Sequence, residues 1–465
     1  MWFRIEQQSY YIYMNKQLFG TDGIRGKANH WPITPEVGMR IGRAVARVLK
    51  AQMAGHHKVV IGKDTRLSGY MLESAITAGL VSEGARVLLT GPVPTPAIAY
   101  LTKSMACDAG VMLTASHNPY TDNGIKIFGP DGYKLNDALE EAVEAIILED
   151  KLSDPEGELG KALRIDDATG RYIEFAKASI GAKSLKGLKI VIDCANGAGY
   201  FVGPLILEEL GAEVISMAVA PDGRNINAGV GALYPELAGE QVKAHGANLG
   251  ICLDGDADRV IFVDENGEEV SGDKVLYMCA KALKAQGKLA KDTLVATVMS
   301  NLGLHSALAK EGIKVEATGV GDRLVIECMR ENGYSLGGEN SGHIIFAESA
   351  TTGDGLMSAL KVLEMMQESG KPLSELASGM EEFPQELHGL DVTEKPPIES
   401  IPELVQVISE VEEEFGADGR VLVRYSGTEN KIRVLVEAKC AQAVKSSTEK
   451  ICAVVEATIG NKSPV

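Results

Sequence analysis

One pattern of residues occurs three times along the chain and constrains the fold more than any other feature. Each copy has an apolar strand, a polar loop, a helical stretch and a second strand of the type Gly-Ala/Ile-x-Val. The copies run from Val59 to Val87, from Ile190 to Val214 and from Leu294 to Val315. Strands that alternate with helical patterns are typical of βαβ units with parallel pairing. The sequence therefore predicts three similar α/β domains.

A further strand and then a polar motif follow each copy. The strands and their motifs are Asp108–Thr114 with Ser116 and His117, Leu249–Leu253 with Asp254–Arg259, and Tyr334–Leu336 with Gly337–His343. Ligands of open α/β sheets bind at the carboxyl ends of strands, where such loops converge. We therefore expect the three motifs to meet in one central cleft.

The rest of the chain does not repeat this pattern and is predicted to form a smaller C-terminal α+β domain. A stretch rich in Pro and Glu, Met380–Glu399, is interpreted as the linker to it. Beyond the linker we expect a helix over Ile401–Phe415, strands over Val421–Val423 and Ile432–Val436, and a helix over Ala441–Ile459. Met1–Tyr13 is interpreted as a tag or an upstream start. The predicted domains span 14–167, 168–268, 269–382 and 383–465.

The balance of charge bears on the partners of the chain. A net charge of −18 argues against nucleic acid or an anionic membrane surface. An anionic ligand must then be held by a local cluster of Arg, Lys and backbone N–H groups. The seven cysteines have no CxxC spacing, which indicates reduced thiols in a cytoplasmic protein. Since no apolar run approaches the ~20 residues of a membrane span, we expect no membrane segment.

Three carboxylates follow a strand at alternate positions, in the order Asp254, Asp256 and Asp258. Hard oxygen ligands without His or Cys suit Mg²⁺. A Ca²⁺ loop of the EF-hand type fails, because Arg259 takes the place of its glycine and Val260–Val263 has a strand pattern. A solvated acidic turn stays as the structural alternative.

The hydroxyl of Ser116 is expected at the end of a strand, where Asn118 and Pro119 signal a turn. We interpret Ser116 as presented and not packed, with His117 pointing elsewhere. Lys126 places a cation ten residues later. The G-x-S-x-G elbow of hydrolases does not surround Ser116, whereas a serine near a Mg²⁺ site suits phosphoryl transfer. Taken alone, Ser116 would more often be a turn residue.

Further polar loops could bind a phosphate group or neighbouring hydroxyls. The segment from Arg424 through Ser426 to Gly427 and Thr428 combines a guanidinium with hydroxyls between two strands, as in a phosphate nest, and Arg433 adds a second guanidinium. A polar hairpin tip is the alternative. Glu339, Ser341 and His343 suit vicinal hydroxyls. Arg25 lies in a Gly-rich loop that alone is a weak signal, and Arg323 is either a loop ligand or an ion pair between domains.

Together these motifs resemble one family, the α-D-phosphohexomutases, from about Leu18 to Ile459. The resemblance is carried by FGTDGIRG, TASHNPYTDNGIKI, LDGDADRV, GGENSGHII and VRYSGTENKIRV in family order. It implies three similar mixed α/β domains around a central cleft plus a smaller C-terminal domain, which agrees with the repeats. FGTDGIRG, Thr297–Leu302 and Thr351–Gly355 look most like the branch that acts on glucosamine phosphates.

The resemblance also implies roles for individual residues. Ser116 corresponds to the serine that is phosphorylated for activity. One Mg²⁺ would be bound by Ser116 together with Asp254, Asp256 and Asp258. The catalytic set would be Ser116, Lys126 as general acid/base, Arg25, Arg259 and His343. The substrate-binding set would be Glu339 and Ser341 for sugar hydroxyls, and Arg424, Ser426, Gly427, Thr428 and Arg433 for the phosphate that is not transferred.

The implied reaction passes a phosphoryl group between Ser116 and a hexosamine phosphate through a bisphosphorylated sugar, which also primes the enzyme. A cytoplasmic monomer or homodimer is expected. Gly231–Tyr234 reads GALY where the glucosamine branch usually has Gly-Ser-Thr-His. Glucose or mannose phosphates therefore stay open as alternative substrates, beside a Mg²⁺-dependent phosphatase and a sugar-phosphate binding protein.

Overall fold

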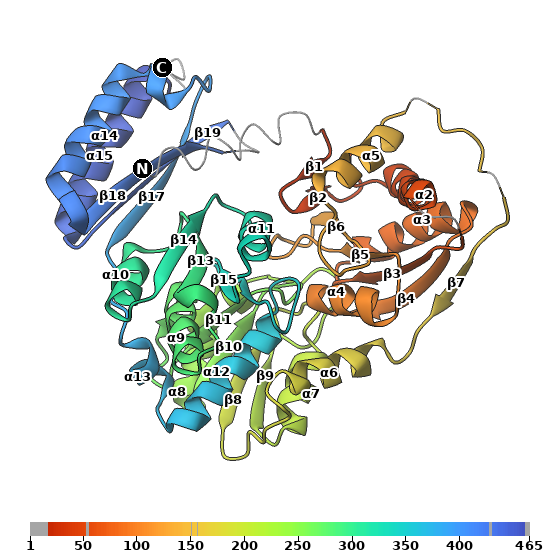
Figure 1. Ribbon diagram of the computed structural model, residues 1–465, viewed down its shortest axis with the longest axis horizontal. Helices are drawn as coiled ribbons and strands as arrows, with labels where there is room; N and C mark the ends of the chain where they lie inside the picture. Colours follow the sequence, from red (N-terminus) through yellow and green to blue (C-terminus); the bar gives the residue numbers. More distant parts are fainter. Residues whose placement is uncertain (1–16, 53–54, 150, 156, 427–429, 461–465) are drawn as a thin grey trace.

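The computed structural model describes residues 17–52, 55–149, 151–155, 157–426 and 430–460. Met1–Tyr13 and two residues of the predicted phosphate nest, Gly427 and Thr428, lie outside these ranges. In the described part, the strands form four separate sheets with helices packed beside them (Figure 1). Within the same part, no helix has the length and apolar character that crossing a membrane would require.

The first sheet has seven strands in the order β1-β2-β6-β5-β3-β4-β7. Its elements are β1 (Phe19–Gly20), β2 (Gly23–Lys27), α2 (Pro35–Gln52), β3 (Lys58–Lys63), α3 (Ser68–Ser82), β4 (Arg86–Pro92), α4 (Thr95–Ser104), β5 (Ala109–Leu113), β6 (Asp122–Phe128), α5 (Asp137–Ile147) and β7 (Lys161–Arg164). All five residues of β5, AGVML, are buried, as expected for an inner strand covered on both faces.

The second and third sheets follow in the chain. The second contains β8 (Lys189–Asp193), β9 (Glu213–Met217), β10 (Leu249–Leu253), β11 (Val260–Val263) and β12 (Glu269–Val270), with α6 (Ala168–Ala178), α7 (Val202–Glu209) and α8 (Pro235–His245). The third contains β13 (Thr293–Thr297), β14 (Lys314–Thr318), β15 (Leu336–Gly338) and β16 (Ile344–Phe346), with α9 (Gly272–Ala285), α10 (Leu302–Lys310), α11 (Asp322–Asn332), α12 (Gly355–Ser369) and α13 (Leu373–Ala377).

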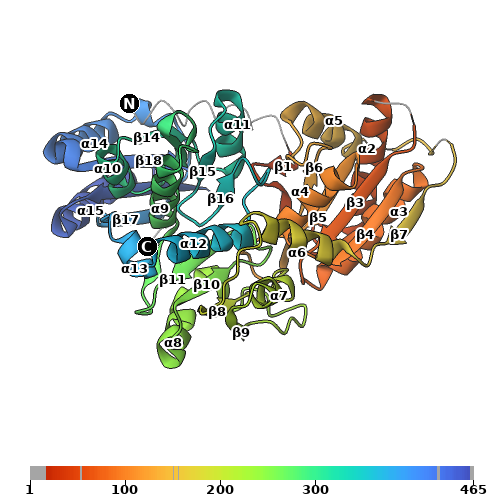
Figure 2. The same ribbon diagram turned by 60° about the horizontal axis from the view of Figure 1, so that its bottom comes forward.

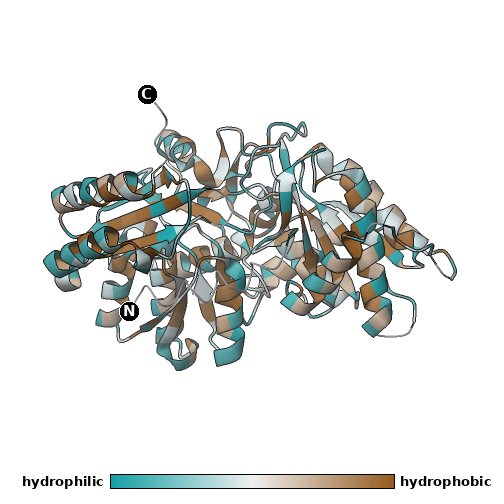
Figure 3. Ribbon diagram, turned by 90° about the horizontal axis from the view of Figure 1, so that it is seen from above, coloured by the Kyte–Doolittle hydropathy of each residue, from teal (hydrophilic) through white to brown (hydrophobic). Residues whose placement is uncertain are grey.

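The same unit of four strands lies in all three sheets, in the orders β6-β5-β3-β4, β11-β10-β8-β9 and β16-β15-β13-β14. In each unit the first strand pairs antiparallel with the second, and the other pairs are parallel. The prediction of three similar α/β domains is therefore confirmed. Figure 3 shows apolar strands between helices of mixed character, and one continuous hydrophobic cluster runs through all three domains.

The fourth sheet, β17-β19-β18, has its own hydrophobic core. Its elements are β17 (Gln385–Asp391), α14 (Pro402–Phe415), β18 (Gly419–Tyr425), β19 (Lys431–Ala438) and α15 (Ala441–Thr458). The interpretation of Met380–Glu399 as a linker is wrong where β17 lies. Among the described residues this strand pairs only with β19, and most of its residues are exposed. QELHGLD therefore lacks the apolar alternation by which strands are recognised.

The third and fourth domains meet at Ser300 and Leu302, at the start of α10. Arg420 and Glu437 form a buried ion pair of 2.8 Å between Nε and Oε2. Arg420 Nη2 also donates to Ser300 O at 2.6 Å, and Glu437 Oε1 accepts from Leu302 N at 2.6 Å. Beside this junction, Asp273 Oδ2 accepts from Asn301 N at 2.7 Å.

Asp273 makes stability depend on pH. Burial raises the pKa of its carboxyl to about 7, although the Asn301 N–H acts in the opposite direction. Between about pH 4 and about pH 7 the folded protein thus holds a proton that the unfolded chain has lost, so the free energy of unfolding should fall as pH rises. We expect Asp273→Asn to reduce the difference between the free energies of unfolding at about pH 5 and about pH 8, measured by urea unfolding. The exposed Asp154→Asn is the control, and an unchanged difference in Asp273→Asn would contradict this prediction.

Candidate active site

Ser116 lies in the loop between β5 and β6, with a backbone φ of +52°. Its hydroxyl donates to Asp254 Oδ2 at 2.6 Å and lies 3.3 Å from His117 Nδ1. The prediction that Ser116 is presented to solvent and not packed is therefore wrong. Only 1% of the residue is exposed, and its hydroxyl contacts Asp254. The expectation that His117 points elsewhere is also wrong, because the left-handed turn at Ser116 breaks the alternation of side chains along a strand.

A buried arginine holds this loop in place. The Arg66 side chain, which is 0% exposed, pairs with Asp64 at 2.7 Å and donates to four carbonyl oxygens of the loop. Those carbonyls belong to Ser116, Asn118, Pro119 and Asp122. Asn227 of the second domain donates to the carbonyls of Ser116 and Asn118 at 2.9 and 3.0 Å. Side chains from two domains thus hold the backbone of the serine loop in place.

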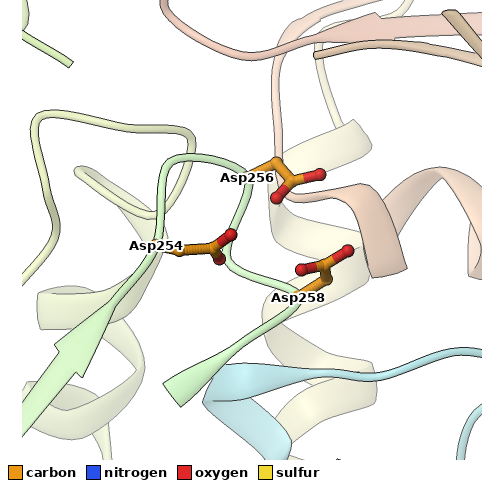
Figure 4. Close-up of side chains that lie close together, drawn as sticks. All are labelled: Asp254, Asp256 and Asp258. Atoms are coloured by element: carbon orange, nitrogen blue, oxygen red, sulfur yellow. The ribbon is translucent and has the colours of Figure 1, made fainter. Parts of the chain in front are cut away.

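The predicted carboxylate cluster forms in the loop between β10 and β11 (Figure 4). One oxygen from each of Asp254, Asp256 and Asp258 lies within 4.8 Å of the others, and all three residues are buried. Burial and the charges of Asp256 and Asp258 raise the pKa of Asp254. Within the described residues, Asp256 Oδ1 and Asp258 Oδ1 have no hydrogen-bond partner. Crowded carboxylates with unused oxygens fit a divalent cation.

Lys126, on β6, brings a buried ammonium to the same carboxylates. Its Nζ lies 3.1 Å from Asp256 Oδ2, 3.0 Å from Asp258 Oδ2 and 3.4 Å from Asp22 Oδ2. Although burial lowers the pKa of Lys126, the charges of Asp256 and Asp258 outweigh it, so the pKa is raised. The side chain therefore stands as a cation between the first and second domains.

Arg25, on β2, is brought to the site because β2 pairs with β6 and places Arg25 opposite Gly124. Its guanidinium donates to Asp22 Oδ2. Lys134 donates to the other oxygen of Asp22, and to Asp322 Oδ2 at 2.6 Å. Although burial acts against it, the charges of Lys134 and nearby cations hold the pKa of Asp322 well below its usual value. These residues form a charged network between the first and third domains.

Arg259 connects the carboxylate loop to the serine loop and to the third domain. Its guanidinium Nη1 lies 3.4 Å from His117 Nδ1, and Nη2 lies 3.9 Å from Glu339 Oε2. Burial and the positive charges of Arg259 and Arg25 lower the pKa of His117 to about 4. His117 is therefore a neutral imidazole at neutral pH, beside the Ser116 hydroxyl. One of its two ring nitrogens carries no proton and can accept a hydrogen bond.

The third domain contributes the loop between β15 and β16, as the repeat pattern predicts. His343 Nδ1 lies 3.7 Å from Asp258 Oδ1, and Nε2 lies 3.7 Å from Asp322 Oδ2. Burial lowers the pKa of His343, but the contact with Asp258 and the negative charges of Asp258, Asp322 and Glu339 prevail and raise it. Ser341 Oγ donates to Glu339 Oε2 at 3.5 Å. The carboxylate and hydroxyl predicted to bind sugar hydroxyls therefore lie together.

The predicted phosphate nest belongs to the fourth domain, at the turn between β18 and β19. Arg424 and Arg433 are opposite each other on these strands. Ser426 N donates to Lys431 O at 2.8 Å, and Lys395 Nζ donates to Ser426 O at 2.7 Å. Figure 2 places this domain on the other side of the third domain from the first. The two arginines and the serine thus form a group apart from the Ser116 cluster.

Several residues of the site carried no motif signal. They are Asp64, Arg66, Thr95, Lys134, Asn227 and Asp322, and Thr95 Oγ1 donates to Asp256 Oδ2 at 2.5 Å. Apart from the pair of Asp64 with Arg66, their partners lie far away in the chain, so spacing could not indicate them. Arg323, by contrast, forms one of the two predicted alternatives, an ion pair between domains with Asp137 and Glu140.

Comparison with known proteins gives matches along almost the whole chain. The phosphoglucomutase/phosphomannomutase models match as domain I over residues 16–154, domain II over 170–267, domain III over 271–383 and the C-terminal domain over 389–454. A phosphoglucosamine mutase of Syntrophotalea carbinolica is 53% identical over 96% of this chain and 99% of its own length. One of Geobacter metallireducens is 54% identical over 96% and 100%.

Solved structures share the fold. A phosphoglucomutase/phosphomannomutase family protein of Burkholderia thailandensis superposes with a TM-score of 0.77 at 24% identity, covering 94% of this chain and 97% of its own. The N-acetylphosphoglucosamine mutase of Aspergillus fumigatus, solved with GlcNAc-6P and magnesium, gives 0.67 at 18% identity, covering 97% and 98%. With four domain models in order and relatives above 50% identity, the chain belongs to the phosphoglucomutase/phosphomannomutase family of α-D-phosphohexomutases.

Proposed function

We propose that the chain interconverts glucosamine 6-phosphate and glucosamine 1-phosphate through a phosphorylated Ser116. The curated relatives named phosphoglucosamine mutase, at 52–54% identity, support the substrate. The observation that carries the chemistry is the Ser116 hydroxyl, 2.6 Å from Asp254 and beside three carboxylates and several cations. A serine in this setting suits phosphoryl transfer, where positioning and charge neutralisation do most of the catalysis.

In the transfer step, the bond between phosphorus and Ser116 Oγ breaks while a bond forms to the oxygen of the sugar hydroxyl. The proton leaves that hydroxyl and is returned to Ser116 Oγ, so the step balances. Lys126, as a cation, is our candidate to give its Nζ proton to Ser116 Oγ and to take up the proton of the sugar hydroxyl in exchange, with His343 assisting. Arg25 and Arg259 would hold oxygens of the transferring group by charge-assisted hydrogen bonds. Ser116 takes a phosphoryl group back from the bisphosphorylated sugar in the second half of the reaction.

Asp254, Asp256 and Asp258, together with phosphorylated Ser116, would hold one Mg²⁺. A bound Mg²⁺ supplies positive charge that offsets the charge on the transferring phosphoryl group. In this assignment Lys126 shares two of the carboxylates and therefore lies next to the reacting group. The unused oxygens of Asp256 and Asp258 support this assignment.

The sugar would bind in the central cleft, with its hydroxyls against the third domain and one phosphate against the fourth. Glu339 and Ser341 would accept and donate hydrogen bonds to its hydroxyls, and the phosphate that is not transferred would bind Arg424, Ser426, Gly427, Thr428 and Arg433. The bisphosphorylated intermediate must turn around between the two halves of the reaction, which requires the fourth domain to open. A separate hydrophobic core in that domain supports such movement.

Other features complete the proposal. We assign domain bounds of 14–167, 168–268, 269–382 and 383–465, supported by the four separate sheets. Seven free cysteines support a cytoplasmic location, where thiols stay reduced. A monomer or a homodimer is the expected assembly.

The experiment that tests the proposed substrate is a comparison of initial rates. Conversion of glucosamine, glucose and mannose 6-phosphates to the 1-phosphates is measured with Mg²⁺ and a trace of the matching bisphosphate. We expect a clear preference for glucosamine. Preference for glucose or mannose would overturn the substrate and leave the roles at Ser116 standing. In that case Gly231–Tyr234, where Leu233 and Tyr234 are exposed, would be exchanged for Gly-Ser-Thr-His and retested.

A further inference from the structure

Lys134 joins the first and third domains next to the active site. It follows β6 in the chain, and its Nζ donates to Asp22, in the turn between β1 and β2. The same Nζ donates to Asp322 Oδ2, at the start of α11, at 2.6 Å. The Lys134 side chain is 8% exposed and the Asp322 side chain 10%. Lys134 and Asp322 thus form a nearly buried ion pair, and neither residue has a role in the proposed reaction.

Each partner of Lys134 also contacts groups that act on the phosphoryl group. The second oxygen of Asp22 accepts from Arg25 Nη2 and lies 3.4 Å from Lys126 Nζ. The Asp322 oxygen that accepts from Lys134 lies 3.7 Å from His343 Nε2. Lys134 is thus one contact away from three of the residues proposed to handle the proton and the phosphoryl oxygens.

The charges explain why this contact matters. Without Lys134, one oxygen of Asp22 and one of Asp322 would lose their cation inside a site that already holds Asp254, Asp256 and Asp258. Breaking a buried pair leaves an uncompensated charge, and nearby cations move to satisfy it. Lys126 would then move toward Asp22 and away from Asp256 and Asp258. Arg25 would move toward Asp22 and away from the phosphoryl group.

We propose that Lys134 is a positioning residue for the transfer. It holds Asp22 of the first domain against Asp322 of the third, and this arrangement orients Arg25 and Lys126 toward Ser116. The inference rests on the proposed function and extends it, because it makes the geometry of the phosphoryl-transfer groups depend on contact between these two domains.

Arg323 provides a matched control at the same junction. It is the next residue after Asp322, and its guanidinium binds Asp137 at 2.6 Å, Glu140 at 3.0 Å and Leu135 O at 2.6 Å. These partners belong to α5 and the segment before it. Arg323→Met therefore removes an ion pair between the same two domains on the side of α5, while the Lys134 bridge stays.

The test compares Lys134→Met, Lys134→Arg and Arg323→Met with the wild-type enzyme in the mutase assay. We expect Lys134→Met to lower kcat by about 100-fold, as a misplacement of about 1 Å does, with KM nearly unchanged. Lys134→Arg should recover part of kcat, and Arg323→Met should lower the thermal midpoint more than kcat. If Lys134→Met does not fold, Asp322→Asn, which keeps the shape of the side chain, is measured for the same kcat loss.

Two results would overturn the inference. One is a wild-type kcat in folded Lys134→Met or, where that variant does not fold, in Asp322→Asn. The other is an equal loss of kcat in Arg323→Met, which would reduce Lys134 to a general interface residue. Wild-type activity is read in the same assay. Absence of mutase turnover in the wild type would instead be a failure of the proposed function.

Discussion

Replacing Ser116 by alanine should abolish isomerisation of sugar phosphates, with a loss of at least about 10⁴-fold in kcat. The oxygen that carries the phosphoryl group would be absent, and none of the cations around it can replace a covalent carrier. The fold should persist, because Arg66 and Asn227 hold the loop by its backbone carbonyls. Coupled assays of 1-phosphate formation measure the rate, and circular dichroism checks the fold.

Thr121→Ala is the control for this variant. Thr121 is an exposed residue of the same loop, and in the described part of the chain its hydroxyl has only a long contact of 3.5 Å with Asp122. It should keep the wild-type rate. Isomerisation that survives in Ser116→Ala would refute the role of Ser116. Hydrolysis that survives without isomerisation would favour the phosphatase alternative.

Removal of the metal should have the second largest effect. We expect chelation to reduce kcat by at least roughly 10³-fold, since a metal contributes several kcal/mol of charge stabilisation, and added Mg²⁺ should restore it. Asp256→Asn should raise the Mg²⁺ concentration needed for half-maximal activity, because one of three charged ligands becomes neutral. Activity is measured across a Mg²⁺ titration.

The matched control for Asp256→Asn is Asp222→Asn. Asp222 is a residue outside the site whose carboxylate accepts from the backbone N–H groups of Arg224 and Asn225. Its Mg²⁺ titration should equal that of the wild type. Full activity after chelation, or a wild-type Mg²⁺ titration in Asp256→Asn, would contradict the role of these carboxylates as metal ligands.

The repeated sheets were predictable because their central strands are continuous apolar runs, which are easily recognised as buried strands. LGICL of β10 is wholly buried, and the Asp254 loop follows it directly. The order of strands in each sheet then explains why the polar loops of the three repeats occupy equivalent places. β17 was not predictable in this way, since an exposed edge strand has no apolar face to reveal it.

The site was predictable only where chemistry is concentrated in a short motif. Ser116 and the three aspartates are such residues, and the structure brings them together. The burial of Ser116 and the position of His117 depend on a positive φ, which an alternating strand pattern cannot indicate. Lys134 and Asp322 are 188 residues apart in the chain, so only the packing of the domains brings them together.

A single turnover of enzyme phosphorylated on Ser116 tests whether this serine passes its phosphoryl group to the sugar. Glucosamine 6-phosphate and Mg²⁺ are added, and the phosphate on the Ser116 peptide and the sugar products are followed by mass spectrometry. We expect phosphate to leave Ser116 while glucosamine 1,6-bisphosphate forms in equal amount. Phosphate that stays on Ser116, or that appears as inorganic phosphate without the bisphosphate, would contradict this expectation.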